Sequence, residues 1–258
     1  VVVHPASQRS LVASCEHAVH GRSYLKVERP GVLLTSPVAL EAWAWSGGGP
    51  EVLAVDVERG AYLMTAVPGR PLTWCDPFSV QNTPAVTSLL LAGRERFASR
   101  APVSGIPPLD LVAGSAVRTA AERLARLPED TAAPFDPQLL ERDGRQCLDV
   151  PRHGGLLHGD LAPSNVLGSG PAHGPVTRLS FIDPEPVLGP LEWDVATWCG
   201  RADLSGRMGE HLAAVRSVTA FDEPLMAWFL SFQARTYIAY RLAFGREIPD
   251  ALVEAALL

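Results

Sequence analysis

The chain has 258 residues, 47% of them hydrophobic, and a formal net charge of −6 at pH 7. These values are typical of a globular chain with a substantial core and exclude an intrinsically disordered one. The acidic balance argues against nucleic acid and anionic membrane as main partners, and no apolar run approaches the ~20 residues that span a bilayer.

The cysteines and the first residues bear on the cellular compartment. The four cysteines are far apart and show no metal-binding spacing: Cys15, Cys75, Cys147 and Cys199. We expect them to be free thiols, as in a reducing cytoplasm. The start, from Val1 to Pro5, has neither a basic leader nor an apolar stretch of a signal peptide. We therefore expect a cytoplasmic protein, acting as a monomer.

Short strands and one helix are predicted for residues 1–67. The strand-like runs lie at 11–15, 24–27, 52–55 and 61–64. Lys26 lies in the middle of the second run between apolar neighbours, where a lysine is costly unless it snorkels or has an anionic partner. It is either an edge-strand lysine that faces solvent or a phosphate-binding lysine, as on the third strand of a kinase.

The predicted N-terminal helix lies between the second and the third of these runs. Ser36 can cap its N-terminus, Pro37 suits its first position, and the glycines at 47–49 end it. Glu41 is the only acid in this helix. It is therefore the candidate partner for Lys26.

Further helices are predicted where apolar residues recur at helical spacing. These segments are 83–97, 115–127, 207–219 and 224–243. The segment 130–151 is polar and is expected to be irregular, with one turn near Leu139. A strand at 176–182 is expected to end at Asp183.

A polar loop from His158 to Asn165 lies between two short apolar runs. Within it, Asp160 can accept a hydroxyl proton. Asn165, five residues later, and Asp183, after the next strand, offer the hard oxygen ligands that Mg²⁺ prefers. This spacing is that of the metal-and-nucleophile half of a kinase site. The alternative is a polar turn whose Asp and Asn bond only to local backbone.

The loop and two runs after it carry a family resemblance. His158 to Asn165, Ile182 to Pro186 and Glu192 to Ala196 resemble the aminoglycoside phosphotransferase family, and within it the streptomycin and hydroxyurea phosphotransferases. The strong similarity covers 154–196, and a weaker one covers 22–72.

The resemblance implies a two-lobed, protein-kinase-like α+β fold. Residues 1–66 would form a small β-rich lobe that binds the nucleotide, and residues 67–258 a larger, mostly helical lobe with the catalytic loop and the acceptor site. The implied cofactors are ATP (or GTP) and Mg²⁺, held in the cleft between the lobes. Asp160 would be the catalytic base, with Asn165 and Asp183 as metal ligands.

The resemblance also assigns residues to the nucleotide and to the loop. Lys26, steadied by Glu41, would neutralise phosphate charge, and Ser7 and Ser10 would cover the phosphates in place of a glycine loop. Three residues of a hinge are candidates for the adenine pocket: Met64, Thr65 and Val67. Asp194 either braces the catalytic loop, as the resemblance implies, or is a first-turn Asp favoured by the helix dipole.

The implied reaction transfers the γ-phosphoryl group to a hydroxyl of a small cationic antibiotic, a streptomycin-like aminoglycoside, and so confers resistance. Its guanidinium groups cannot lose their charge at neutral pH and need carboxylate partners. The candidate acids follow Asp183 in the chain: Glu185, Glu192, Asp203, Asp222, Glu223 and Glu247. We expect at least two of them to line the cleft.

Two other functions stay open. One is a kinase for another acceptor, such as hydroxyurea, another antibiotic, or an endogenous sugar or amino alcohol. The other is a catalytically weak, kinase-like binding protein. The absence of glycine from 4–10 favours the second, whereas the presence of Lys26, Asp160, Asn165 and Asp183 argues against it.

Overall fold

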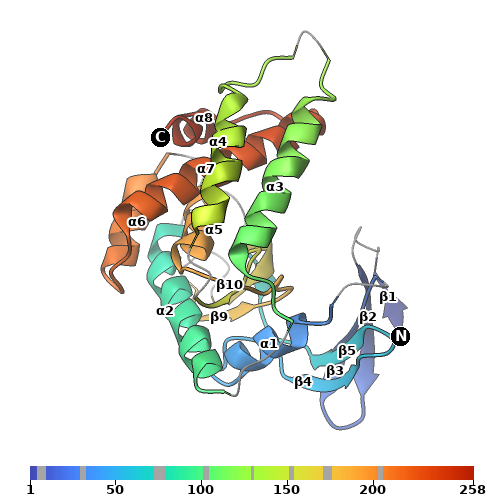
Figure 1. Cartoon of the computed structure of the whole chain (residues 1–258). Helices are drawn as coiled ribbons and strands as arrows, with labels where there is room; N and C mark the ends of the chain where they lie inside the picture. The colour runs from blue at the N-terminus through green and yellow to red at the C-terminus, as the bar shows by residue number, and fades with distance from the viewer. Residues whose placement is uncertain are drawn as a thin grey trace.

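The fold is α+β, with a five-stranded sheet in the N-terminal part of the chain and the long helices in the C-terminal part (Figure 1). The computed structural model describes residues 1–4, 10–29, 33–72, 79–100, 105–128, 131–150, 154–170, 176–202 and 206–258. Among these residues, no helix is both long and apolar enough to cross a membrane.

An antiparallel sheet of five strands forms the N-terminal part. The strands are β1 (Val2–Val3), β2 (Ser10–His17), β3 (Gly21–Glu28), β4 (Val52–Asp56) and β5 (Ala61–Thr65). Their order is β1-β2-β3-β5-β4, which places β3 at the centre. Lys26 on β3 pairs with Val12 on one side and Tyr62 on the other, and it is only 6% exposed. The edge-strand interpretation of Lys26 is therefore wrong.

Helix α1 (Ser36–Ala44) lies in the chain between β3 and β4 and packs against the next helix. Its N-cap is Thr35, which makes no side-chain cap bond, so Ser36 is not the cap that its sequence position suggested. Instead, the Ser36 hydroxyl donates a hydrogen bond of 3.0 Å to the carbonyl oxygen of Pro184. The start of α1 is thereby fixed to the segment that follows Asp183.

The C-terminal part is built mainly from helices. These are α2 (Ser79–Ala98), α3 (Leu109–Leu124), α4 (Gln138–Gln146), α5 (Glu192–Ala202), α6 (Met208–Arg216), α7 (Glu223–Ala243) and α8 (Asp250–Ala256). The four helices predicted from apolar spacing are confirmed as α2, α3, α6 and α7.

Helix α4 lies where the sequence predicted an irregular segment. Its residue Asp143 is buried and forms an ion pair of 2.8 Å with Arg235 on α7. The same carboxylate accepts a hydrogen bond of 3.1 Å from the indole of Trp228. Both partners are far away in the sequence, so the local pattern gave no sign of what holds this helix in place.

Two small sheets hold the polar loop. Their strands are β6 (Arg70–Pro71), β7 (Gly155–Leu157), β8 (Val166–Ser169), β9 (Arg178–Phe181) and β10 (Val187–Gly189). Strand β7 pairs with β10, and β8 lies between β6 and β9. The loop from His158 to Asn165 therefore leaves one sheet and enters the other, and Asp183 follows β9, as predicted.

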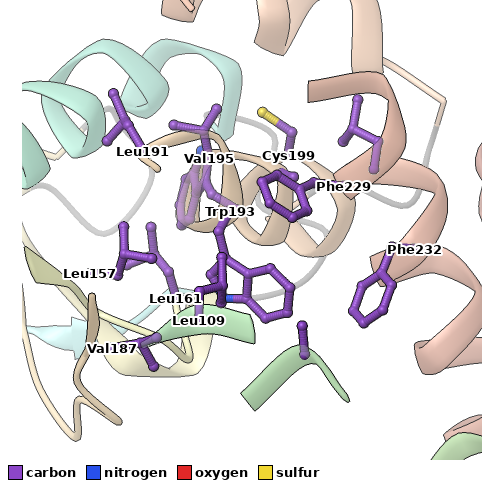
Figure 2. Packing of buried hydrophobic residues seen from close by; sticks show 14 of the residues in the cluster. Leu109, Leu157, Leu161, Val187, Leu191, Trp193, Val195, Cys199, Phe229 and Phe232 are labelled. Atoms are coloured by element: carbon purple, nitrogen blue, oxygen red, sulfur yellow. The ribbon is translucent and has the colours of Figure 1, made fainter. Parts of the chain in front are cut away.

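Aromatic side chains of α5 and α7 form the core beneath this loop. The ring of Trp193 lies 5.4 Å from that of Phe229 and 5.5 Å from that of Phe232 (Figure 2). Leu157 and Leu161, just before and within the loop, are fully buried in the same cluster. Each such side chain contributes about 1.5–3 kcal/mol when it leaves water. The polar loop therefore rests on a packed base.

Candidate active site

The backbone of the loop is held by Asp194 from the first turn of α5. One carboxylate oxygen of Asp194 accepts a hydrogen bond of 2.6 Å from the amide of His158, and the other accepts one of 2.9 Å from the amide of Gly159. Of the two interpretations of Asp194, the bracing role is therefore the one that the structure shows. Burial raises the pKa of this carboxyl to about 6, although the two amides and Arg94 oppose that shift.

Gly159 adopts a conformation that other residues would strain. Its φ is +80°, and a Cβ at this position would lie 1.8 Å from the carbonyl oxygen of Glu185. Only glycine combines this backbone angle with such a close approach. The amide of Glu185 also donates to the carbonyl of His158, at 2.8 Å, so the loop and the segment after Asp183 are directly connected.

His158 is a buried structural residue. Its Nε2 lies 3.0 Å from the carbonyl oxygen of Ile182, and its ring packs 5.6 Å from Trp43 and 5.5 Å from Phe181. Burial lowers the pKa of its imidazole to about 4. The ring is therefore neutral at physiological pH, which agrees with a role in holding the loop.

The depressed pKa of His158 predicts how stability depends on pH. Between about pH 4 and 6.5 the unfolded chain binds the proton more readily than the folded protein does. The stabilising contribution is complete above pH 6.5 and is lost as the pH falls towards 4. From pH 7 to pH 5 the loss is about 2 kcal/mol.

Urea unfolding of the wild type and of His158→Gln at pH 7 and pH 5 measures this loss. Asp194, whose raised pKa acts in the opposite direction, is present in both proteins and cancels. We expect the wild type to lose about 2 kcal/mol more than the variant over this range. Equal losses would show that His158 does not titrate as described.

Asp160 is positioned by two donors. Its Oδ1 accepts a hydrogen bond of 2.9 Å from Nη1 of Arg201, and its Oδ2 accepts one of 3.0 Å from Nδ2 of Asn165. Asn165 also donates to the Asp160 carbonyl, at 2.9 Å. The Asp160 side chain remains 37% exposed. It is thus a fixed carboxylate that a ligand can reach.

Asp183 lies beside the loop in a strained backbone conformation. Its φ is +54°, the one positive value recorded for a described residue other than glycine. The amide of Ile182 donates to the carbonyl of Asn165, at 3.0 Å, which ties this segment to the loop. The Asp183 side chain is 56% exposed. Strained positions of this kind cluster at functional sites.

The oxygen atoms of Asp183 and Asn165 suit a hard divalent cation. One oxygen of Asp183 is bonded to Lys26, and no described residue bonds the other. The amide of Asn165 directs its nitrogen to Asp160, which leaves its oxygen without a donor among the described residues. The described part of the chain contains no cluster of three or more His, Cys, Asp or Glu ligands. Mg²⁺ commonly takes only one or two protein ligands when phosphates supply the others.

Lys26 pairs with Glu28 and Asp183, and not with Glu41. Its Nζ lies 2.8 Å from Oε1 of Glu28 and forms a second ion pair with Asp183. Glu41 is on the outer side of α1, where its carboxylate, 46% exposed, pairs with Arg100 at 2.9 Å. The predicted Lys26–Glu41 pair is therefore wrong in this structure. The signal for Glu28 was in the sequence, because side chains two residues apart on a strand share a face.

The acidic neighbours keep Lys26 charged. Burial alone would lower the pKa of this ammonium, but the charge that Tyr62 can carry, the charge of Asp183 and the hydrogen bonds to Asp183 and Glu28 outweigh it. The pKa of Lys26 is therefore raised above its ordinary value. Lys26 is thus a charged donor that can bind a phosphate oxygen once a divalent cation neutralises the Asp183 carboxylate.

Two adjoining cavities open on these residues, each of about 670 Å³. The first, here called the lysine cavity, is lined by residues that include Ser10, Lys26, Glu28, Ser36, Asp183 and Glu185. The second, called the arginine cavity, is lined by residues that include Arg123, Asp160, Arg201, Tyr237, Tyr240 and Arg246. Gly159 and Glu185 line both, so the polar loop stands between them.

The serines predicted to cover the phosphates and the residues predicted for the adenine pocket differ in whether they line a cavity. Ser10 lines the lysine cavity, whereas Ser7 is outside the described residues. Neither cavity is lined by Met64, Thr65 or Val67. The hydroxyl of Thr65 instead accepts a hydrogen bond of 2.9 Å from the amide of Glu51. The adenine pocket therefore stays a prediction.

Most of the predicted acceptor acids lie away from the cavities. Glu192 accepts a hydrogen bond of 2.9 Å from the amide of Asp222, and Asp222 caps α7 through the amide of Leu225. Glu223 pairs with Arg216 on the surface, at 2.8 Å.

Three of the predicted acids remain: Glu185, Asp203 and Glu247. Glu247 is exposed, and Asp203 is outside the described residues. Of the five acids that the structure describes, Glu185 alone lines a cavity. The expectation of two lining acids is wrong for this part of the chain, because these carboxylates are used as a cap, a backbone acceptor and a surface ion pair. No local sequence pattern pointed to Arg123, Arg201 and Arg246, which come together only through the packing of α3, α5 and α7.

Comparison with known proteins supports the fold. No family model matches the chain, and no curated protein does. Solved structures do match over almost its whole length. A "putative fructosamine-3-kinase" from Thermobifida fusca is 20% identical, with a TM-score of 0.63 over 99% of this chain and 91% of that one.

Two antibiotic kinases match similarly. Amicoumacin kinase hAmiN, in complex with AMP-PNP, Ca²⁺ and Ami, is 14% identical with a TM-score of 0.63, over 99% of this chain and 86% of that one. Macrolide 2'-phosphotransferase MphH from Brachybacterium faecium is 19% identical with a TM-score of 0.56, over 99% and 89%. The chain therefore has the protein-kinase-like fold of these small-molecule kinases, and its activity has to be argued from the site.

Proposed function

We propose that the protein is an ATP-dependent O-phosphotransferase that transfers the γ-phosphoryl group to a hydroxyl of a small molecule, acting as a cytoplasmic monomer. One observation carries the proposal. Three separate segments of the chain come together at the polar loop and bring four residues to it: Lys26, Asp160, Asn165 and Asp183. On one side of the loop is a cavity with the charged Lys26, and on the other a cavity with the fixed carboxylate of Asp160.

The lysine cavity is the proposed nucleotide site. Lys26 would bind the phosphates, and Ser10 would offer a donor at the entrance. The oxygens of Asn165 and Asp183 would hold the divalent cation, which neutralises phosphate charge when bound. A kinase of the same fold binds AMP-PNP and Ca²⁺, which supports a nucleotide and a divalent cation here. Mg²⁺ as the ion, and ATP rather than GTP as the nucleotide, belong to the proposal.

The arginine cavity is the proposed acceptor site. Asp160 would accept a hydrogen bond from the acceptor hydroxyl and take its proton as the new P–O bond forms and the bond to the leaving ADP oxygen breaks. Arg201 and Asn165 hold the Asp160 carboxylate in place. Phosphoryl transfer depends mainly on such positioning and on charge stabilisation.

The identity of the acceptor is less well supported than the reaction. A streptomycin-like acceptor, with antibiotic resistance as the outcome, stays a prediction from the sequence. Besides Asp160, the arginine cavity has one lining acid, Glu185, which offers little for several guanidinium groups. Hydroxyurea, another antibiotic or a metabolite remain the other candidates. A binding protein without activity is the less favoured reading, because the four residues that the reaction needs are all present and close together.

Glu28 provides a test of the nucleotide site. In Glu28→Gln, Lys26 loses a charged partner, and a hydrogen bond to a charged group is worth about 1.5–3 kcal/mol. We expect the KM for ATP to rise about tenfold or more. The matched control is Glu41→Gln, which should leave that KM within about twofold because Glu41 pairs with Arg100 on the surface. The reverse result would mean that the lysine changes its partner when nucleotide binds.

The reaction itself is tested by incubating the protein with ATP, Mg²⁺ and a broad panel of hydroxylated small molecules. ADP release identifies an acceptor, and phosphorus NMR of the product identifies a phosphate ester. The proposal predicts acceptor-dependent ADP release that Asp160→Asn removes. If the protein binds ATP but no acceptor raises ADP release above the rate in water, the binding-protein alternative is favoured.

A further inference from the structure

We infer that the acceptor carries a negatively charged group, a carboxylate or a phosphate, which the arginine cavity binds at a distance from the reacting hydroxyl. This inference rests on the proposed function for the identity of the reaction, but the anion-binding site that it describes can be tested without any turnover.

Two stacked tyrosines of α7 are surrounded by arginines. The rings of Tyr237 and Tyr240 are nearly parallel, at 8°, with centroids 6.0 Å apart. The guanidinium carbons of Arg123 and Arg246 lie 5.2 Å and 5.3 Å from the centroid of Tyr240. Arg123, Tyr237, Tyr240 and Arg246 all line the arginine cavity.

Arg201 and Arg241 lie over the ring of Tyr237 in the same way. Their guanidinium carbons lie 5.5 Å and 5.6 Å from its centroid. These two cations have other partners, since Arg201 pairs with Asp160 at 2.9 Å and Arg241 donates to the carbonyl of Glu247. Both guanidinium groups therefore already have acceptors within the protein.

Arg123 and Arg246 are different. Among the described residues, neither forms an ion pair with a carboxylate; their recorded side-chain contacts are those with Tyr240. Arg123 comes from the last turn of α3, where a cation also suits the helix dipole, but this does not explain why a second arginine approaches the same ring. Two guanidinium groups that converge without an acid favour an anion between or beside them.

The position of Arg246 is fixed by the way α7 ends. Gly245 has a φ of +61°, its amide donates to the carbonyl of Leu242 at 3.0 Å, and the amide of Arg246 donates to the carbonyl of Arg241 at 2.8 Å. This pair of bonds is the Schellman motif, in which glycine takes the left-handed position after the helix. The chain is thereby turned back so that Arg246 lies over Tyr240.

The charges of the cavity also argue against a cationic acceptor. The arginine cavity is lined by two carboxylates, Asp160, which pairs with Arg201, and Glu185, against three arginines, Arg123, Arg201 and Arg246. A cationic ligand would approach aromatic rings whose faces are occupied by guanidinium groups. A hydroxylated anion would instead place its hydroxyl at Asp160 and its charge at Arg123 and Arg246. The volume of about 670 Å³ is ample for a sugar acid or a sugar phosphate.

The test uses four compounds that share one polyol chain. Gluconate carries a carboxylate, sorbitol 6-phosphate a phosphate, sorbitol no charge and N-methylglucamine a positive charge. The arginine-selective reagent phenylglyoxal is applied with each compound, and the rate of modification is followed at individual arginines by mass spectrometry. We expect at least one of the two anions to slow modification of Arg123 and Arg246 about tenfold, and which anion does so identifies the charged group.

Arg118 is the internal control. It is exposed on α3, the same helix as Arg123, but lines neither cavity, so its modification should be unaffected. Loss of protection at Arg246 in Arg123→Ala, but not in Arg118→Ala, would show that the two arginines form one site. Equal protection by sorbitol or N-methylglucamine, or no protection by either anion, overturns the inference.

A kinetic measurement separates this inference from the proposed function. If an acceptor is found, Arg123→Ala should raise its KM about tenfold or more, while the KM for ATP stays within about twofold and Arg118→Ala changes neither. Efficient phosphorylation of a cationic acceptor, with no effect of Arg123→Ala, would overturn the anionic acceptor and leave the kinase standing. Protection by an anion without any acceptor-dependent ADP release would overturn the kinase and leave the anion-binding site standing.

Discussion

Replacing Asp183 with asparagine is expected to abolish phosphoryl transfer, lowering kcat by more than about 10³-fold. The substitution removes a carboxylate that serves two purposes. In the proposed site it would offer the cation an anionic oxygen, and it pairs with Lys26 in the lysine cavity. Removing one preorganised charge of this kind commonly reduces kcat by about 10²–10³-fold, and here two contacts are lost together.

The measurement is ADP release at saturating ATP and acceptor, with folding checked by circular dichroism and urea unfolding. Asp56→Asn is the matched control, because Asp56 lies on β4, in the sheet that holds Lys26, and pairs with Arg59 on the surface. The control should retain full activity. Near-normal turnover by a folded Asp183→Asn protein would show that the metal site lies elsewhere.

Replacing Asp160 with asparagine is expected to lower kcat by about 10²–10⁴-fold, the usual effect of removing a general base. The side chain keeps its shape but loses the charge and the proton acceptor. Asp160 lines the arginine cavity and not the lysine cavity, so ATP binding should change by no more than about twofold. Arg201 loses its ion pair, which makes a check of folding essential.

Calorimetric titration of ATP into the folded variant, beside single-turnover kinetics, separates the two effects. Unchanged affinity with a slow chemical step is the predicted outcome. If nucleotide binding collapses while the rate per bound ATP remains normal, Asp160 acts on the nucleotide and the assignment of the two cavities has to be reversed.

The parts of the site that the sequence predicted are those in which local order and function coincide. Asp160 and Asn165 lie on one short loop between two buried strands, and Asp183 follows the next strand, so their spacing alone indicated the site. The amphipathic helices were predicted for a similar reason, because one apolar face of each meets the core.

The errors arose where distant residues decide the structure. Helix α4 depends on the buried ion pair of Asp143 with Arg235, which no local pattern reveals. Glu41 was the only acid of α1, but the orientation of that helix directs it to Arg100, while Glu28 on the strand itself meets Lys26.

The arginine cavity, which we propose as the acceptor site, was the least predictable part. The sequence suggested several acids after Asp183 as acceptor ligands. In the structure, Asp222 caps α7 and Glu223 forms a surface ion pair with Arg216. The arginines and tyrosines that do line the cavity come from α3, α5 and the end of α7, and they meet only after these helices pack. Charge in a pocket is a property of tertiary packing and does not follow from the composition of a segment.

A crystal structure of the protein with AMP-PNP and Mg²⁺ would show whether the proposed nucleotide and metal sites are correct. We predict the triphosphate in the lysine cavity, with Lys26 on a phosphate oxygen, Mg²⁺ bound by Asp183 and Asn165, and the terminal phosphate directed towards Asp160. A nucleotide bound outside that cavity, or a metal ion bound without Asp183 and Asn165, would contradict this prediction.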